Sequence, residues 1–247
     1  RARPRARARQ QRPRRPAAVD GLVQQVVIAD GGSEDRTVAL AEEAGADVVI
    51  SQSGRGHQIR AGIAASRAPW LLVLHSDTEL HPGWEAEVSA FMTSVDLGRR
   101  EKSAAAFRYA LNDSGFIPRL METIVHIRCN VAKLPYGDQA LLIPRRLYDE
   151  IGGYKPMPIL EDVEIVRRLG RRRMSILKSG ALTSSERYRK DGYLRRIFRN
   201  QVCLLMYACG IPEERIASYY KAPSGNKQTT SEGGTTSKEL VQPIKPS

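Results

Sequence analysis

Hydrophobic and polar residues follow one another along residues 22–220 in short blocks that are typical of an α/β fold. Short apolar runs at 26–29, 47–50 and 69–74 each end in polar residues or glycine, as strands buried on both faces do. Residues 37–44 and 59–66 lie between these runs and have helical character. Because the connections are short, the sequence predicts a mostly parallel central sheet flanked by helices.

The same alternation continues through the second half of the chain. Further strands are predicted at 103–111, 140–143 and 174–178, and further helices at 82–94, 116–131, 160–169, 187–209 and 212–219. The helix at 116–131 is amphipathic, with four apolar residues on one side: Leu120, Ile124, Ile127 and Val131.

The composition divides the chain into three segments. Residues 1–21 are rich in Arg, Ala and Pro, and residues 221–247 are rich in Ser, Thr, Gly and Lys. Neither segment has enough apolar residues for a core, so both are expected to be disordered. Residues 22–220 are expected to form one folded domain.

The charge of the chain is unevenly distributed. The formal net charge is +12, but eight arginines lie in residues 1–15, which leaves +4 for the remainder. A basic nucleic-acid-binding protein without catalysis is therefore one alternative, but no nucleic-acid-binding motif accompanies the arginines, and we expect no such partner. The three cysteines show no CxxC spacing, which favours a reducing, cytoplasmic location. No apolar run approaches the length of a membrane span.

Polar side chains gather where the predicted strands end. Asp30, Gly31, Gly32 and Ser33 follow one strand, and His75, Ser76 and Asp77 follow another. The carboxyl ends of parallel strands meet at one edge of a sheet, where ligands bind. A carboxylate there can hold a divalent metal and, through it, a phosphate. The alternative is that Asp77 only caps the next helix. A glycine-rich loop from Gly54 to Gln58 precedes a predicted helix and suits phosphate binding.

These motifs, in this order, resemble the family 2 glycosyltransferases, which have the GT-A fold. The resemblance covers about residues 22–220 and rests on four stretches: Val27 to Thr37, Gly54-Arg55-Gly56-His57-Gln58, Leu74-His75-Ser76-Asp77-Thr78 and Leu160-Glu161-Asp162. Within the family the chain is similar to a small bacterial subgroup, the arsenosugar-biosynthesis-type glycosyltransferases. The narrower likeness adds Pro135-Tyr136-Gly137-Asp138-Gln139.

The resemblance implies a nucleotide-sugar donor, a UDP- or GDP-sugar, and a divalent cofactor, Mn²⁺ or Mg²⁺. Asp77 matches the last position of the family's metal-binding Asp-x-Asp motif, whose first position is His75 in this chain. Histidine suits Mn²⁺ better than Mg²⁺, but His75 can also be a packed strand-end residue that donates to a carbonyl. The implied donor-binding residues are Asp30, Gly31, Gly32, Ser33, Arg55, Gly56, Gln58, Ser76 and Asp77.

The resemblance also implies an inverting transfer to an acceptor hydroxyl, although the acceptor is unknown. Asp162 is the expected catalytic base, and Glu161 its neighbour in binding the acceptor. The alternative is that both acids only complement the positive end of their helix. Residues expected to bind acceptor or diphosphate are Asp138, Gln139, Arg187 and Arg189. The two arginines can instead belong to a solvated basic helix surface.

A sugar-phosphate nucleotidyltransferase-like enzyme is an alternative, but the Gly- and Arg-rich triphosphate loop that it needs is not identifiable near the N-terminus. Weak peripheral contact with an anionic membrane is possible through three arginines that lie next to Phe198 and residues 204–206: Arg195, Arg196 and Arg199. The alternative is that this part of the helix covers the domain's own core.

One departure from the family concerns the first strand. Members open with a hydrophobic strand in the middle of the sheet, whereas residues 1–16 here cannot form a buried strand. We therefore expect the strand at 26–29 to lack its usual neighbour and to leave an apolar edge open. We also expect the chain, as an incomplete enzyme, to be poorly soluble or to bind its donor weakly.

Overall fold

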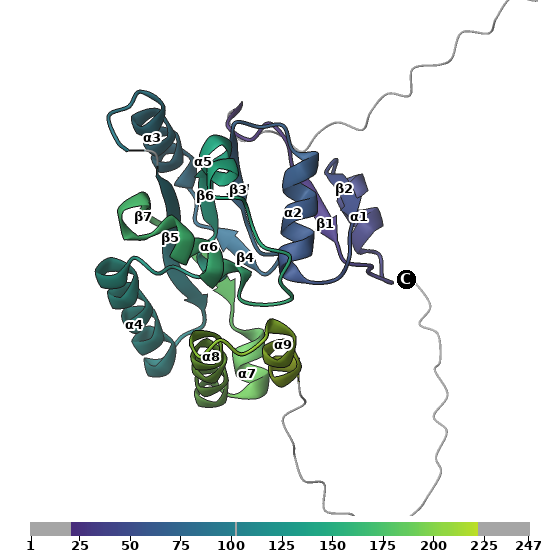
Figure 1. Ribbon diagram of the computed structural model, residues 1–247, viewed down its shortest axis with the longest axis vertical. Coiled ribbons are helices and arrows are strands. Elements are labelled where there is room, and N and C mark those ends of the chain that lie inside the picture. The colour runs from purple at the N-terminus through teal and green to yellow at the C-terminus, as the bar shows by residue number, and fades with distance from the viewer. Residues whose placement is uncertain (1–20, 102, 222–247) are drawn as a thin grey trace, which may run out of the picture.

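The computed structural model describes residues 21–101 and 103–221, in which helices surround two β-sheets (Figure 1). Apart from Gly21 and Lys221, the two segments predicted to be disordered lie outside the described residues. The predicted α/β class is confirmed.

The smaller sheet contains two parallel strands, β1 (Val27–Asp30) and β2 (Asp47–Ile50). α1 (Thr37–Glu43) connects them, and α2 (Arg55–Ala65) follows β2. α2 packs on β1 at Gly62, where an added Cβ would lie 3.4 Å from the Ala29 side chain, in ordinary van der Waals contact. These elements lie where the sequence predicted them, except that α2 begins four residues earlier.

The larger sheet has five strands in the order β3-β6-β5-β7-β4. Their bounds are Trp70–Val73 for β3, Leu141–Pro144 for β6, Ala104–Asn112 for β5, Met174–Ser184 for β7 and Thr78–Leu80 for β4. Only β5 and β7 pair in parallel, whereas the other three pairs are antiparallel. The expectation of a mostly parallel sheet is therefore wrong for this part. The sequence analysis missed β4 because three residues carry no usable periodicity, and it ended β7 too early.

Alternate residues of the central strands pack into two different cores, as the two-residue period of a strand requires. Ala104 and Ala106 of β5 contact one core, which also contains residues of α2, α5 (Arg145–Glu150) and α6 (Glu161–Leu169). Ala105 and Phe107 contact the other core, which α3 (Trp84–Asp96) covers. The five-stranded sheet is thus buried on both faces.

Each sheet has two outer strands whose far edges have no partner strand among the described residues. β1 pairs only with β2, and β3 pairs only with β6. Val26, just before β1, is 40% exposed. The far edge of β1 is therefore open among the described residues, in agreement with the expectation that the strand at 26–29 lacks its usual neighbour.

The C-terminal helices form a separate layer below the sheets (Figure 1). α7 (Glu186–Asp191), α8 (Tyr193–Ala208) and α9 (Glu213–Lys221) replace the two helices predicted there. The predicted helix at 187–209 is interrupted at Gly192, whose φ of 84° is unfavourable for other residues. No helix in the described ranges is both long and apolar enough to cross a membrane.

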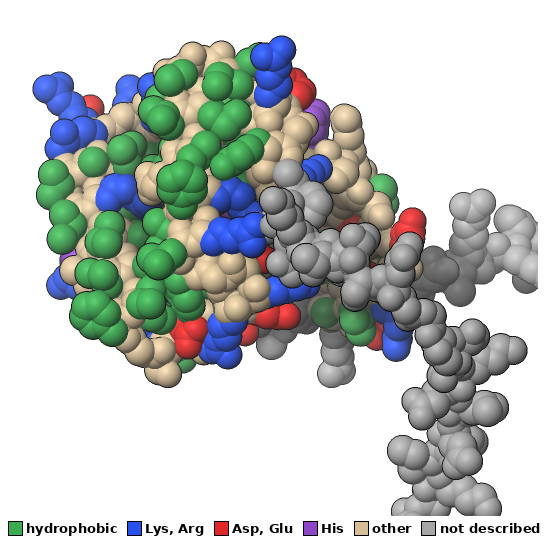
Figure 2. All heavy atoms as spheres, turned by 90° about the horizontal axis from the view of Figure 1, so that it is seen from below, with side chains coloured by type: hydrophobic (Ala, Val, Ile, Leu, Met, Phe, Trp, Pro, Cys, Tyr) green, Lys and Arg blue, Asp and Glu red, His purple; other side chains and the backbone are tan. Residues whose placement is uncertain are grey.

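α4 (Phe116–Ala132) faces the opposite way from what its pattern suggests. Its apolar side, with Ile124 and Ile127 more than half exposed, points to solvent. Pro118 and Cys129 are its buried residues, and Met121 and Val125 pack on a small cluster around Tyr109. Figure 2 shows hydrophobic side chains gathered on this side of the molecule.

Candidate active site

The turn after β3 carries the first group of predicted site residues. The amide of Thr78 donates to the carbonyl of His75 over 3.2 Å and closes the turn. β4 follows at once, and its Thr78 hydroxyl lies 3.2 Å from that of Thr183 in β7. This pairing fixes the backbone beside Asp77, while Ser76 stays exposed.

The short 3₁₀ helix η2 (Gly137–Gln139) brings a second acid to this turn. Asp138 Oδ1 lies 3.5 Å from His75 Nδ1. Burial is the largest influence on His75 and lowers its pKa, but the hydrogen bond to Asp138 and the charges of Asp138 and Asp162 together outweigh it, so the pKa is raised overall. Burial also acts on Asp138, yet its contact with His75 keeps the carboxyl pKa below its usual range. This pair favours a cationic His75 rather than a metal-binding imidazole.

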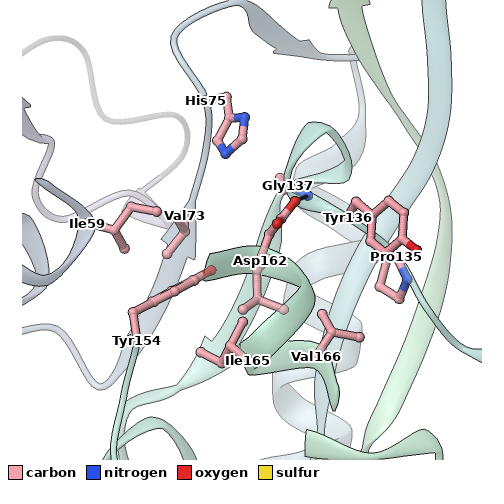
Figure 3. Close-up of a pocket in the computed structure, with 12 residues that line it drawn as sticks. Ile59, Val73, His75, Pro135, Tyr136, Gly137, Tyr154, Asp162, Ile165 and Val166 are labelled. Atoms are coloured by element: carbon pink, nitrogen blue, oxygen red, sulfur yellow. Dashed lines mark hydrogen bonds between the residues drawn. The ribbon is translucent and has the colours of Figure 1, made fainter. Parts of the chain in front are cut away.

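Gly137 lies between His75 and Asp162, where no other residue fits. A Cβ at position 137 would lie 2.4 Å from His75 Cε1 and 3.0 Å from Asp162 Oδ2. The amide of Gly137 donates to Asp162 Oδ2 over 2.6 Å, and the amide of Val163 donates to Oδ1 over 2.8 Å. Figure 3 shows the Asp162 carboxylate directed at Gly137, with the His75 ring beyond it and the Tyr154 hydroxyl pointing towards it. The start of α6 therefore holds Asp162 in one orientation.

Glu161 is in a very different environment from its neighbour. Its side chain is fully buried, and neither carboxylate oxygen has a hydrogen-bond partner among the described residues. Burial, with a contribution from the charge of Asp162, raises the pKa of Glu161 to about 7. Its burial argues against the predicted contact of Glu161 with an acceptor.

α2 packs between the Asp30 loop and the segment that leads into α6. Its Gly56 has no room for a side chain, since a Cβ would lie 2.3 Å from the carbonyl oxygen of Lys155. The amide of Gly56 also donates to the carbonyl of Met157 over 3.0 Å. The absence of a side chain at Gly56 thus allows the backbone of residues 155–157 to pack closely against α2. The sequence analysis had instead predicted that Gly56 contacts the donor.

The Asp30 carboxylate shapes its own loop. It accepts hydrogen bonds from the amides of Gly32 and Ser33 over 2.8 and 2.7 Å, and from the Ser33 hydroxyl over 2.5 Å. These bonds, with the hydroxyl contributing most, lower the pKa of Asp30. Gln58 packs against Gly31 and donates to the Ala29 carbonyl over 3.0 Å. In the described structure, Asp30 and Gln58 therefore order the backbone at the end of β1.

One pocket collects several of these residues. Asp77, Asp138 and Asp162 line it, and Arg55 comes from the first residue of α2. Its opposite wall is formed by the C-terminal helices, through residues that the sequence analysis did not assign to the site: Tyr188, Arg196, Asn200, Cys203, Leu204 and Tyr220. Asp30 does not line this pocket, so the predicted convergence of all the acids is only partial.

Arg196 is the most informative of the missed residues. It is 8% exposed and donates to Asp191 over 3.2 Å and to the Tyr220 hydroxyl over 3.1 Å. Arg199 also pairs with Asp191, over 3.0 Å. The two arginines point inward, so the suggestion that they contact a membrane is wrong. The sequence signal was Asp191, five and eight residues before the two arginines.

Two of the residues expected to bind acceptor or diphosphate, Gln139 and Arg189, do not line the pocket. Gln139 is 2% exposed, donates to the Phe107 carbonyl over 2.8 Å and accepts from Cys129, which argues against contact with an acceptor. Arg189 pairs with Asp113 at the surface. The side chain of Arg187 lies outside the described part of the structure.

The residues of this pocket can hold a divalent cation only if the phosphates of the donor supply some of its ligands. In the described ranges no three His, Cys, Asp or Glu side chains form a group that could hold a metal. Cations of the Mg²⁺ type are often held by one or two carboxylates together with substrate phosphates. Asp77, on the pocket wall, suits that arrangement, whereas a complete protein cage does not exist here.

Comparison with known proteins identifies the family. The model of glycosyl transferase family 2 matches residues 9–151, more than half of the chain. The chain belongs to glycosyl transferase family 2. It is therefore a glycosyltransferase, and the resemblance seen in the sequence is confirmed at the level of the family. The likeness to the arsenosugar-type subgroup stays a prediction.

Solved structures support the same fold. Glucosyl-3-phosphoglycerate synthase from Mycobacterium tuberculosis, in complex with Mn²⁺, UDP and glucosyl-3-phosphoglycerate, is 21% identical, with a TM-score of 0.51 over 78% of this chain and 72% of that chain. Mannosyl-3-phosphoglycerate synthase from Rubrobacter xylanophilus is 16% identical, with a TM-score of 0.46 over 77% and 66%. The likeness to the mycobacterial synthase confirms the GT-A fold. No curated protein sequence matches the chain.

Proposed function

We propose that this glycosyltransferase moves a sugar from a UDP- or GDP-sugar to an acceptor hydroxyl, with inversion at the anomeric carbon and with a divalent cation. The observation that carries the proposal is the convergence of Arg55, Asp77, Asp138 and Asp162 on one pocket. These residues come from four separate stretches of the chain, and hydrogen bonds hold the backbone of each stretch in place.

Arg55 is suited to the diphosphate of the donor. Its guanidinium makes no hydrogen bond to the described residues, although it feels the charges of Glu161, Asp162 and Asp138, which raise its pKa against the effect of burial. A planar guanidinium with available donors matches the oxygens of a diphosphate. The loop from Asp30 to Ser33, which the Asp30 carboxylate orders through the Gly32 and Ser33 amides, is the candidate contact for the nucleoside.

Asp162 is suited to the role of base. Two backbone amides orient its carboxylate without occupying all of its acceptor positions. The acceptor oxygen would attack the anomeric carbon while its proton passes to Asp162, and the bond to the diphosphate oxygen would break with its electron pair. A single displacement of this kind inverts the anomeric carbon. Glu161 is buried behind Asp162, so we assign it no contact with the substrate.

A Mn²⁺ or Mg²⁺ ion held between Asp77 and the donor would offset the negative charge that develops on the departing diphosphate. The mycobacterial synthase of similar fold was crystallised with Mn²⁺ and UDP, which makes that pair the first to test. We assign the cation to Asp77 alone, because His75 is engaged by Asp138.

The test combines ligand binding with turnover. Thermal unfolding is followed with UDP, GDP, UTP or DNA, each with and without Mn²⁺, and nucleoside diphosphate release is measured with a panel of nucleotide sugars. We expect a metal-dependent rise in Tm with UDP or GDP that Asp77→Asn abolishes. Asp149→Asn, which changes an exposed carboxylate of α5, is the matched control.

Two outcomes would contradict the proposal. Stabilisation by UTP but by neither diphosphate would favour a nucleotidyltransferase, and stabilisation by DNA alone would favour a nucleic-acid-binding protein. A response to UDP and Mn²⁺ that survives in the Asp77→Asn variant would move the metal to another group.

A further inference from the structure

α4 and α8 together present an unusually apolar surface to solvent. Nine of the fifteen exposed large hydrophobic residues in the described part lie on these two helices, so the apolar area is concentrated rather than scattered. Large exposed apolar patches mark interaction sites. The nine residues, called the α4–α8 face below, are Phe116, Ile117, Leu120, Ile124, Ile127, Val131, Leu194, Phe198 and Leu205.

The two helices that carry the α4–α8 face are neighbours. Met121 and Val125 of α4 and Tyr193 of α8 pack on the same small cluster around Tyr109. Tyr193 also donates to Asp113, just before α4, over 2.5 Å. Figure 2 shows hydrophobic side chains gathered over this side of the molecule, with basic side chains among and around them.

The charges on these helices are almost all positive. α8 contains three arginines and no acid. Its Arg195 is exposed, as is Lys190 just before it. The one acid of α4, Glu122, is held by Arg119 over 2.6 Å and by the amide of Leu111 over 2.8 Å. The α4–α8 face therefore has a cationic rim without exposed acids on either helix.

Segments of this chain outside the described ranges have the wrong composition to cover the face. Residues 1–20 contain one large aliphatic residue, Val19, and residues 222–247 contain Leu240, Val241 and Ile244. A second copy of the chain is also a poor match. A two-fold interface brings the same patch of each copy together, so the cations of one rim would meet those of the other without acids to pair with them.

We propose that the α4–α8 face docks on an anionic lipid surface. Phe116, Leu194 and Phe198, the most exposed of its apolar side chains, would enter the boundary between headgroups and acyl chains. Arg119, Lys190 and Arg195 would contact the lipid phosphates. The opposite side of α8 lines the candidate pocket through Asn200 and Leu204, so docking would bring that pocket within about one helix diameter of the membrane, roughly 10 Å.

Co-sedimentation of the full chain with vesicles tests the proposal and needs no knowledge of the donor or acceptor. Vesicles of phosphatidylcholine are compared with vesicles of equal parts phosphatidylcholine and phosphatidylglycerol. We expect binding to the anionic vesicles, and a loss of at least about tenfold in affinity for the triple variant Phe116→Ser, Leu194→Ser, Phe198→Ser. Leu97→Ser, at a 60% exposed leucine after α3, is the control and should bind as the parent does.

The electrostatic part is tested separately. Arg195→Gln should weaken binding to the anionic vesicles several-fold, whereas Arg99→Gln, an exposed arginine after α3, should not. The changed side chains are exposed, so each variant should keep the Tm of the parent. The proposal is wrong if the parent does not bind anionic vesicles or if the triple variant binds like the Leu97 control. It is also wrong if sedimentation shows a parent dimer that the triple variant loses.

Discussion

α4 and α6 are both amphipathic helices, but they use their apolar sides in opposite ways. α6 buries Val163, Ile165, Val166 and Leu169, together with Glu161 and Glu164. α4 is longer, yet its buried residues are Pro118 and Cys129, and its apolar side is exposed. In Figure 1, α6 lies against the middle of the larger sheet, whereas α4 lies at the margin of the molecule.

The difference shows that helical periodicity identifies an apolar side without identifying what that side contacts. The sheet surface is already covered by α2, α5 and α6 on one face and by α3 on the other. α4 is left to pack on the extension of β5 through a few residues, so the remainder of its apolar side needs another partner. α6 instead carries acids into the interior, which costs free energy unless they are paired or neutral. Glu164 pairs with Arg168 and Lys155, whereas the Glu161 carboxylate has no hydrogen-bond partner among the described residues and has a raised pKa.

The largest effect is expected at the start of α6. Asp162→Asn should lower the rate of sugar transfer by about two to four powers of ten, the range for a lost general base, with little change in donor affinity. Steady-state kinetics and nucleotide titration measure the two quantities, and Asp149→Asn serves as the control. A variant that loses donor affinity instead would assign Asp162 to donor binding.

A matched pair of substitutions compares the two helices directly. Ile165→Ala in α6 removes a fully buried side chain and should lower the free energy of unfolding by about 2–5 kcal/mol. Ile124→Ala in α4 removes a side chain that is 57% exposed and should change it by no more than about 0.5 kcal/mol. Urea denaturation measures both values. Equal losses at the two positions would mean that α4 is covered in solution.

The ionisation of Glu161 gives a pH-dependent effect of intermediate size. The pKa of Glu161 in the folded chain, about 7, exceeds the ordinary value of 4.5. Between these two pH values the carboxyl group ionises in the unfolded chain but stays protonated in the folded chain, so the folded state loses stability as the pH rises. The contribution of Glu161 is thus most favourable below pH 4.5 and is lost as the pH approaches 7. Glu161→Gln should stabilise the chain by about 1–3 kcal/mol at pH 8 and by little at pH 4. Glu79→Gln, at an exposed position, should show no such trend.

The smallest effect is expected at the ion pair on α4. Arg119→Met removes a contact of 2.6 Å to Glu122 in which the arginine side chain is 58% exposed. Such surface pairs contribute about 0–1 kcal/mol, and Glu122 keeps its bond from the amide of Leu111. Urea denaturation should detect little change, whereas a loss as large as that of Ile165→Ala would show that α4 is held mainly by this pair.

The sequence alone was sufficient for the features that depend on neighbouring residues. Apolar runs and turn residues located most strands and helices, because hydrophobic period and glycine position act locally. Spaced motifs identified the family and the acids Asp77, Asp138 and Asp162, which do meet in one pocket. Local pattern could not detect the three-residue β4, which depends on pairing with β7, or the burial of Gln139, which depends on a bond to Phe107.

Only the tertiary structure decided which side chains face the interior and which face solvent. The apolar side of α4 faces solvent because other helices already cover both faces of the larger sheet. Arg196 and Arg199 turn inward onto Tyr220 of α9, whose hydroxyl accepts a hydrogen bond from Arg196 and whose ring lies against the Arg199 guanidinium. Adjacent Glu161 and Asp162 differ because a helix turns its consecutive residues in different directions, and here one direction leads to the interior and the other to the pocket. Burial and pairing are set by contacts between distant parts of the chain, which no local pattern records.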